Sequence, residues 1–342
     1  MQKHVPYYIT CIISGMVEIG TIFWGINKEY SIEAILGLAI AYQLGNVLRF
    51  FVDETKSRYQ TYVTIFIVLL NVILNIIGNN TLECISYIIE FIMFMLFSIV
   101  LQNIRSAAKG NVPRWKKRSC RVVGFVLSAI FWSLGPQIML LISIQILYYS
   151  IKLDKHYYDN SIIQMNFENS SSIYWSMVTH QAHYFTYTYI IVILVMKYYN
   201  NPWITAVWFA ANWIPYTITE PLIKKTNINS WYLISVIAHL FNAIVLILML
   251  LLYNKNITLM LCFWILTGFG GGNVFCIKKT IFSNKEYDEY RWNLSEQIGH
   301  VLGVGMAILL AVLNLELYAL ILAAAFALIT IPIIKYEKGK LK

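Results

Sequence analysis

Histidine and tyrosine side chains recur at helical spacing in the stretch 173–196. His180, His183, Tyr184 and Tyr187 follow the i, i+3, i+4, i+7 pattern, so they would share one face of a helix. Because imidazole changes charge close to neutral pH, this face could relay protons or contact a bound solute; the alternative is a structural polar seam. Two histidines three residues apart without a nearby carboxylate are a weak ligand set, so we expect no metal site and no other cofactor.

Two carboxylates interrupt apolar stretches nearer the N-terminus. Glu18 lies between Gly15 and Gly20 in the stretch 5–26, and Glu90 lies among isoleucines. An ionisable side chain at the centre of a membrane-spanning helix costs roughly 2.5–3.5 kcal/mol, so it is a candidate functional group. Glu18 is expected to exchange a proton or to bind a cationic group, because no lysine or arginine is expected at the same depth. For both residues the alternative is a structural hydrogen bond to a neighbouring helix.

Aromatic and amide side chains lie together in the stretch 203–222. Asn212 and Trp213 are neighbours there and could line a solute cavity, and Pro215 is expected to kink their helix. The glycine-rich run at 268–273 is not a phosphate-binding loop, because no strand precedes it and no Gly-Lys-Ser/Thr ends it. This run predicts a hinge or a close helix contact.

Two polar pairs on later stretches are weaker candidates. They are His239 with Asn242, and Glu296 with His300. Polar pairs of this kind commonly join neighbouring helices by hydrogen bonds, so we expect both to be structural.

Long apolar stretches are the elements that must position these residues. The chain has 342 residues, of which 58% are hydrophobic and 13% charged, and its mean hydropathy is +0.61. A soluble domain carries about 25% charged residues, so the composition indicates an all-α polytopic membrane protein. Strands of a membrane barrel would be shorter and would alternate strictly. The apolar stretches fall at 5–26, 33–51, 60–78, 83–104, 121–153, 173–196, 203–222, 231–253, 257–277, 293–314 and 316–334.

The stretch 121–153 decides the topology. A helix crosses the bilayer core with about 20 residues, so this stretch is too long for one span and just long enough for two. Lysine and arginine near span ends favour the cytoplasm. One span would divide the 26 basic residues evenly between the two sides, whereas a hairpin turning at Gly135-Pro136 leaves only Lys28, Lys197 and Lys255 outside. We therefore predict about twelve membrane-spanning helices with both termini in the cytoplasm.

Weak internal repetition divides the chain into two halves. The first and seventh predicted spans begin 168 residues apart, at 5 and 173, and a polar segment separates six predicted spans from six. Duplicated halves of this kind are typical of transporters. We predict six-helix bundles at 1–153 and 173–342, joined by a cytoplasmic linker at 154–172.

An acid–base pattern lies at the ends of the second and the eighth predicted span, 33–51 and 203–222. Asp53 precedes Arg58 by five residues, and Glu220 precedes Lys225 by the same interval. Together with the twelve-span pattern, the segment around Asp53 resembles the loop between the second and third helices of the major facilitator superfamily, although its glycines and its first arginine are absent. The resemblance implies two six-helix bundles, and it assigns these four residues to contacts that latch the cytoplasmic helix ends.

The function predicted from these features is secondary transport of a small organic solute, with proton-coupled export as the favoured mode. Two alternatives remain: a multipass membrane enzyme that acts on a lipid-linked substrate, and an accessory or receptor protein that moves no solute. The composition, rich in Ile, Asn, Lys and Tyr, suggests a bacterial cytoplasmic membrane. We expect a monomer that contacts its solute, protons and membrane lipid. The basic segment 105–121 is explained by topology and not by nucleic acid. The candidate solute and proton contacts are Glu18, Glu90, His180, His183, Tyr187, Asn212 and Trp213.

The predicted hairpin can be tested by chemical labelling. We expect a Gln137→Cys variant, made without the native cysteines, to be labelled by a membrane-impermeant thiol reagent from outside the cell, because Gln137 would follow the outer turn. Labelling only from the cytoplasmic side of inverted vesicles would contradict the hairpin.

Overall fold

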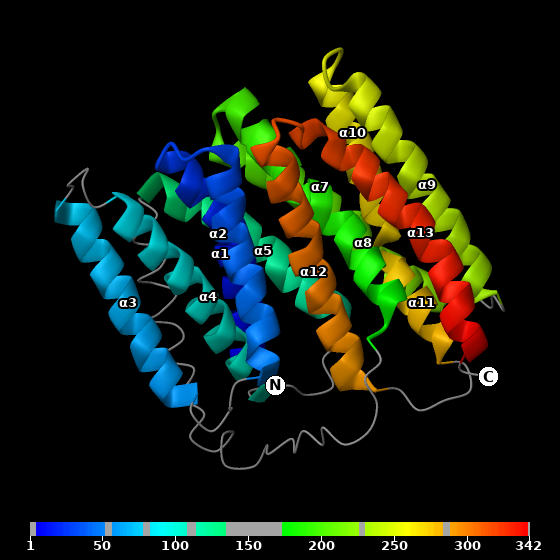
Figure 1. Cartoon of the computed structure of the whole chain (residues 1–342), viewed down its shortest axis with the longest axis horizontal. Coiled ribbons are helices and arrows are strands. Elements are labelled where there is room, and N and C mark those ends of the chain that lie inside the picture. Colours follow the sequence, from blue (N-terminus) through cyan, green and yellow to red (C-terminus); the bar gives the residue numbers. More distant parts are fainter. Residues whose placement is uncertain are drawn as a thin grey trace. The chain divides into compact units, whose positions relative to one another are not determined.

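The computed structural model describes residues 5–51, 57–77, 83–107, 114–134, 173–225, 230–282 and 288–340. Every regular element in these ranges is a helix, which confirms the all-α class. The chain divides into two compact units, Met1–Ser170 and Ser171–Lys342, which we name unit 1 and unit 2. Figure 1 shows the helices of both.

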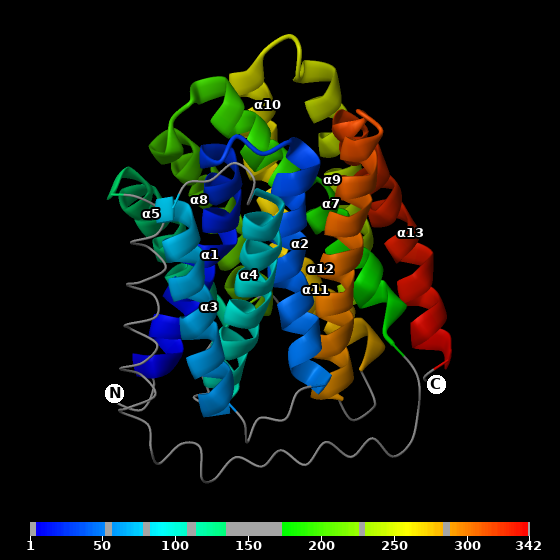
Figure 2. The ribbon, with the colours of Figure 1, turned by 60° about the vertical axis from the view of Figure 1, so that its left-hand side comes forward.

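Unit 1 is built around a core of aromatic and aliphatic side chains. Trp24 and Phe94 are buried in it with their ring centres 6.1 Å apart. On the opposite, outward side, apolar residues such as Ile73 and Ile76 are exposed, as the lipid-facing side of a membrane helix requires. Figure 2 shows α3 and α4 side by side. The elements are α1 (Val5–Asn27), α2 (Ile32–Leu48), the 3-10 turn η2 (Arg49–Phe51), α3 (Ser57–Ile77), α4 (Glu83–Ala107) and α5 (Arg114–Leu134).

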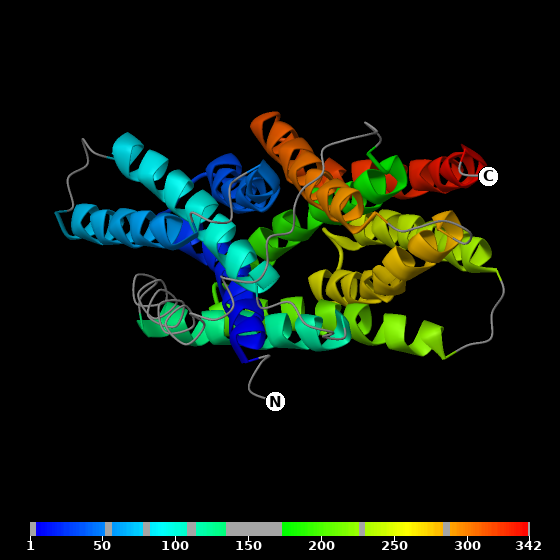
Figure 3. The ribbon, with the colours of Figure 1, turned by 90° about the horizontal axis from the view of Figure 1, so that it is seen from below.

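Helices α1 and α5 cross at close range, as Figure 3 shows, because each presents a glycine at the contact. A Cβ added to Gly15 would overlap the backbone oxygen of Arg121, and one added to Gly124 would overlap that of Ile12. Small residues let helix backbones approach each other in membranes. The close crossing of α1 and α5 therefore requires glycine, which has no side chain, at both positions.

Unit 2 is organised around α7, in which every residue from Ser176 to Ile193 is buried. This helix packs against α8, α11, α12 and α13. Because so many of its residues are polar, their partners must come from those neighbours or from the carbonyl oxygens of α7 itself. The elements are α7 (Trp175–Tyr199), α8 (Pro202–Lys224), α9 (Trp231–Leu252), α10 (Ile257–Thr267), the 3-10 turn η5 (Gly268–Gly272), α11 (Asn273–Ile281), α12 (Glu289–Val312), the 3-10 turn η6 (Glu316–Tyr318) and α13 (Ala319–Lys340).

Asparagines set the ends of helices in unit 2. Asn200 ends α7 in the left-handed conformation, with φ 45°. The side chain of Asn201 accepts hydrogen bonds from the backbone N of Trp203 and of Ile204, at 2.9 and 3.2 Å, and Pro202 opens α8. Asparagine tolerates the left-handed region and caps helix starts well, so two residues suffice to turn the chain.

The glycine-rich run forms a break between α10 and α11. It is the 3-10 turn η5, and it packs against the backbone of α8. A Cβ on Gly268 would overlap the backbone oxygen of Asn212, and one on Gly271 would overlap that of Tyr216. The close helix contact predicted from the sequence is thus confirmed. The predicted kink at Pro215 remains a prediction; α8 continues through this residue as one helix.

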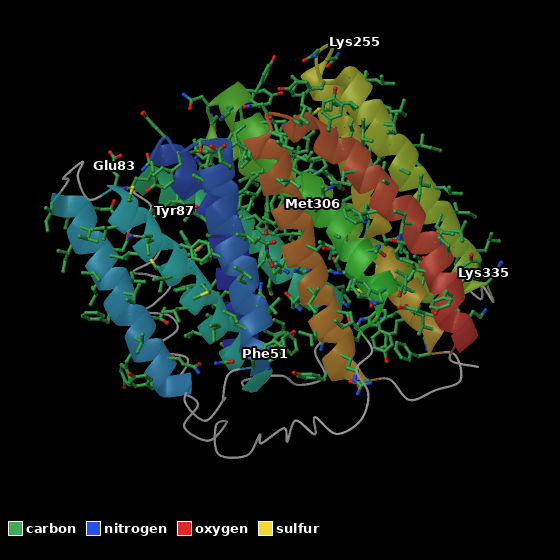
Figure 4. All side chains as sticks on the ribbon, in the orientation of Figure 1. Phe51, Glu83, Tyr87, Lys255, Met306 and Lys335 are labelled. Atoms are coloured by element: carbon green, nitrogen blue, oxygen red, sulfur yellow. The ribbon has the colours of Figure 1, made fainter. Side chains whose placement is uncertain are left out.

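Eight helices in the described ranges are long and apolar enough to cross a membrane. Helices α7 and α8 have spanning length, with 25 and 23 residues, but are not among these eight; α7 carries the polar face described above. In Figure 4, Lys255 and Lys335 mark opposite ends of unit 2, as Glu83 and Phe51 do in unit 1, with Tyr87 one turn after Glu83. The predicted total of twelve spans and the cytoplasmic termini remain predictions.

One boundary predicted from the sequence is wrong. Helix α5 begins at Arg114 and not at 121, so Arg121 lies two turns inside the helix. The predicted turn at Gly135-Pro136, the sixth span and the linker 154–172 lie outside the described residues.

The glycine contact of α1 with α5 predicts a selective loss of stability. Gly124→Ala should lower the stability by about 1–3 kcal/mol, because its Cβ meets backbone that cannot move independently. Thermal unfolding of the purified protein in detergent measures this loss. Gly339→Ala is the matched control, because a Cβ there meets nothing within 4 Å. Equal unfolding midpoints for the two variants would contradict the contact.

Candidate functional site

Glu18 is held by an ion pair inside unit 1. Its carboxylate accepts from the guanidinium of Arg121 on α5, and its side chain is 1% exposed. The expectation that Glu18 lacks a basic partner is therefore wrong. The reason is that α5 starts earlier than expected and carries Arg121 to the depth of Glu18, beside the glycine contact with α1. Such a carboxylate can exchange its guanidinium for a proton or for a cationic group.

Glu90 is fully buried near the end of unit 1 that holds the α1–α2 turn. Its two oxygens accept from the hydroxyls of Tyr30, at 3.0 Å, and Ser86, at 3.4 Å. Burial, together with the Glu90 carboxylate, raises the pKa of the Tyr30 phenol, so this phenol stays a donor. In the same turn Lys28 donates to Asn75 of α3. These contacts join the turn to α3 and α4, which favours the structural alternative for Glu90.

Three histidines meet in unit 2. Nδ1 of His180 lies 3.0 Å from Nε2 of His239 on α9, and Nδ1 of His183 lies 2.7 Å from the carbonyl oxygen of His180. The ring centres are 5.1 to 6.1 Å apart. All three side chains are buried. Tyr187, one turn after His183, is buried on the same face, with its ring centre 6.4 Å from that of His183.

Asn212 ties three elements of unit 2 together. Its oxygen accepts from the hydroxyl of Tyr184 at 2.8 Å, and its amide nitrogen donates to the carbonyl oxygen of Trp264 at 2.7 Å and to Thr267 at 3.1 Å. Both amide atoms are thus engaged within the protein. Trp213 is buried against Tyr216, with ring centres 5.0 Å apart. Asn212 therefore acts first as a cross-link of α7, α8 and α10.

The face of α7 that carries His180, His183, Tyr184 and Tyr187 is joined by residues that are weaker candidates in the sequence. His239 joins it from α9, and Asn242, one turn further, lies against Gly270 of η5. A local signal for His239 exists, because its Nδ1 lies 2.7 Å from the carbonyl oxygen of Ser235 one turn earlier. Its contact with His180, 59 residues away, has no sequence signal. Of the weaker pairs, Glu296 accepts from Gln181 at 3.3 Å, as a structural hydrogen bond between helices would.

The predicted latch of unit 2 uses a different lysine. Glu220 pairs with Lys224 at 2.6 Å, one turn away on α8, and not with Lys225. A spacing of four residues keeps the two side chains on one helix face, whereas five does not. Asp53 lies outside the described residues, and Arg58 lies in the first turn of α3. A second contact at a helix end was missed: Glu337 of α13 accepts from the hydroxyl of Ser176 at the start of α7.

No group of three or more His, Cys, Asp or Glu side chains among the described residues could hold a metal ion. The histidine cluster shows why. Nδ1 of His239 is bound to a carbonyl oxygen and its Nε2 to His180, so the three rings do not offer three free nitrogens.

Solved structures share this fold, although no protein-family model and no curated protein matches the chain. One is a crystal structure of a bacterial homologue of the iron transporter ferroportin in an outward-facing state with soaked iron. It has a TM-score of 0.63 and 12% identity, covering 98% of each chain. A second, of such a homologue in the outward-facing state, has a TM-score of 0.63 and 10% identity, covering 99% of this chain and 100% of that one.

At these identities the likeness concerns the fold. The chain is a polytopic helical membrane protein whose fold is similar to that of these two homologues. The described residues share the all-helical architecture that the sequence resemblance predicted.

The Glu18–Arg121 pair predicts strong energetic coupling. Glu18→Gln and Arg121→Gln should each cost about 3 kcal/mol, because each leaves a buried charge without its opposite, and the double variant should cost less than their sum. Thermal unfolding in detergent gives the three values. Glu220→Gln is the control, because its partner Lys224 is half exposed and such pairs contribute below about 1 kcal/mol. Additive costs at Glu18 and Arg121 would contradict the pair.

Proposed function

We propose that this protein is a secondary transporter that exports a small organic solute in exchange for protons by alternating access. The fold supports the class of protein, because its solved counterparts are homologues of a transporter. The single observation that carries the mode of coupling is the buried Glu18–Arg121 ion pair, since a paired carboxylate can release its guanidinium when it binds something else.

The pair suggests an order of events in unit 1. A proton, or a cationic group of the solute, competes with Arg121 for the Glu18 carboxylate. When Arg121 is displaced, its guanidinium must find another acceptor, because a buried unpaired charge is costly. Exchange at Glu18 therefore changes the contact between α1 and α5, where Gly15 and Gly124 let the two helix backbones approach.

Unit 2 contributes a surface without formal charge. The buried α7 face presents imidazole and phenol groups, and Trp213 packs beside Tyr216. Aromatic side chains stabilise cationic and planar groups through their faces. This combination favours a cationic or amphipathic organic solute. Glu90, Tyr187, Asn212 and Trp213 remain proposed contacts, and the latch remains a proposal for Asp53, Arg58 and Glu220, with Lys224 in place of Lys225 as the basic partner of Glu220.

A divalent metal ion is the competing cargo, because the two solved counterparts are homologues of an iron transporter. The enzyme and receptor alternatives gain no support from these counterparts. The proposal also includes the location in a bacterial cytoplasmic membrane, the contacts with lipid and the monomeric state.

Flux in vesicles tests the function. Purified protein in liposomes loaded with a pH-sensitive dye should move protons when ethidium, an aromatic organic cation, is added, and an imposed pH gradient should drive ethidium uptake. Glu18→Gln should reduce both fluxes at least tenfold. Full gradient-driven uptake by Glu18→Gln would sink the proposal, and so would Fe²⁺ flux in place of ethidium flux.

A further inference from the structure

One buried nitrogen of the histidine cluster is left without a partner. Nε2 of His183 has no hydrogen-bond partner in the described parts of the chain, and the side chain is 2% exposed. Buried polar atoms nearly always find a partner, and inside a membrane the requirement is stricter. Nδ1 of the same ring lies 2.7 Å from the carbonyl oxygen of His180. Because a carbonyl oxygen only accepts, Nδ1 carries the hydrogen, and Nε2 of the neutral ring is a bare lone pair.

The same argument assigns the tautomers of the other two rings. Nδ1 of His239 lies 2.7 Å from the carbonyl oxygen of Ser235, so it donates and leaves Nε2 as an acceptor. Nδ1 of His180 lies 3.0 Å from that Nε2 and is therefore the donor. In the neutral cluster all three rings carry their hydrogen on Nδ1. His239 thus positions His180, and the carbonyl of His180 positions His183.

We infer that Nε2 of His183 is a proton-binding site, with His180 and His239 as positioning residues that keep this nitrogen ready to accept. Binding forms one N–H bond at Nε2 and turns the neutral ring into an imidazolium. The proton comes from water on one side of the membrane and returns to water on the other. The role of this proton in exchange rests on the proposed function; the binding site itself does not.

Ionisable groups reach α7 from several neighbouring helices. Of the four carboxylates among them, Glu220 pairs with Lys224, Glu296 accepts from Gln181, and Glu337 accepts from Ser176. Helix α10 and the turn η5 contribute no acidic or basic residue. The groups on the elements packed against α7 are Tyr216, Glu220 and Lys224 of α8, Cys276, Lys278 and Lys279 of α11, Glu289, Tyr290, Arg291, Glu296 and His300 of α12, and Lys335, Tyr336, Glu337, Lys338 and Lys340 of α13.

An imidazolium at His183 would therefore have no carboxylate bonded to it among the described residues. A buried charge without a counter-charge favours any arrangement that solvates or pairs it. Proton binding at His183 would consequently shift unit 2 toward a second conformation. The break at η5, where Gly270 lies against Asn242, one turn after His239, is an interruption of regular helix beside the cluster.

The three histidines are expected to bind only one proton at a time, because two positively charged rings would repel each other. Two positive rings with centres 5.5 Å apart would weaken the binding of the second proton by roughly a hundredfold at an effective dielectric constant of about 20. We therefore expect one proton for each protein molecule at this site.

Solid-state NMR of the full chain in lipid bilayers, with ¹⁵N-labelled histidine and a chelator present, tests the inference. Six histidines contribute signals, and single variants assign them. At neutral pH and above, His180, His183 and His239 should all show the Nδ1–H tautomer. On acidification one imidazolium should appear, at His183. A hydrogen on Nε2 of neutral His183, or two imidazolium signals that rise together in the cluster, would overturn the inference.

Matched variants separate this role from a structural one. His183→Asn keeps a donor near the Nδ1 position and removes Nε2, so the imidazolium should disappear while the fold remains. His239→Gln offers His180 an acceptor near the Nε2 position and should preserve the tautomer of His180, whereas His239→Asn should not. His300→Gln, which alters a buried histidine that packs on Phe185 of α7, should leave the cluster signals unchanged.

Transport of ethidium provides an independent arm. His183→Asn should keep the exchange of ethidium that occurs without a pH gradient. Its rate of pH-driven ethidium uptake should be at least tenfold lower than that of the unaltered protein. If the unaltered protein moves no solute, the proposed function fails, while the NMR titration still decides the proton site. If His183→Asn keeps full pH-driven uptake, the coupling role of His183 is wrong.

Discussion

Polar groups in a membrane-spanning bundle must be satisfied by the protein itself, because hydrocarbon offers no hydrogen bonds. Helix α7 shows the consequence most clearly. It is buried along eighteen consecutive residues, from Ser176 to Ile193, and many of them are polar. Several of these polar side chains draw a specific partner from a neighbouring helix, and those contacts help to fix how the helices of unit 2 pack, whereas others, such as Thr186 and Thr188, bond to carbonyl oxygens of α7 itself. Asn212 with Tyr184, and His239 with His180, are two such contacts.

Close backbone approach is the second requirement, and glycines meet it in both units. In unit 1 the contact of Gly15 and Gly124 brings α5 against α1, which places Arg121 beside Glu18. In unit 2 the glycines of η5 let the broken helix approach the backbone of α8. Packing and chemistry are coupled at both places, because the residues that permit the contact lie next to the residues that carry the polar interaction.

The two units differ in how they hold their ionisable groups. Unit 1 pairs Glu18 with a guanidinium and surrounds Glu90 with hydroxyl donors. Unit 2 collects imidazoles that are neutral in the described arrangement and leaves one lone pair, on His183, without a partner. An ion pair separates when a competing charged group binds one of its members. A neutral histidine cluster instead changes its charge when it binds a proton. This difference is the physical basis for proposing exchange of a proton or a cationic group at Glu18 in unit 1 and a separate proton-binding site at His183 in unit 2.

The sequence by itself determined the helical class, nearly all helix positions in the described ranges and the shared face of His180, His183, Tyr184 and Tyr187, because apolar length and helical periodicity are local properties. The close contact at the glycine run was predictable for the same reason. Its partner on α8 was not. Long-range pairings were decided only by the tertiary structure. The sequence alone indicates that Arg121 is a basic residue at the end of a span that sets the topology. In the structure, α5 places it beside Glu18, 103 residues away in the chain. His239 became a member of the histidine cluster only because α9 packs there. No local pattern encodes which two helices meet, since that depends on the packing of the whole unit.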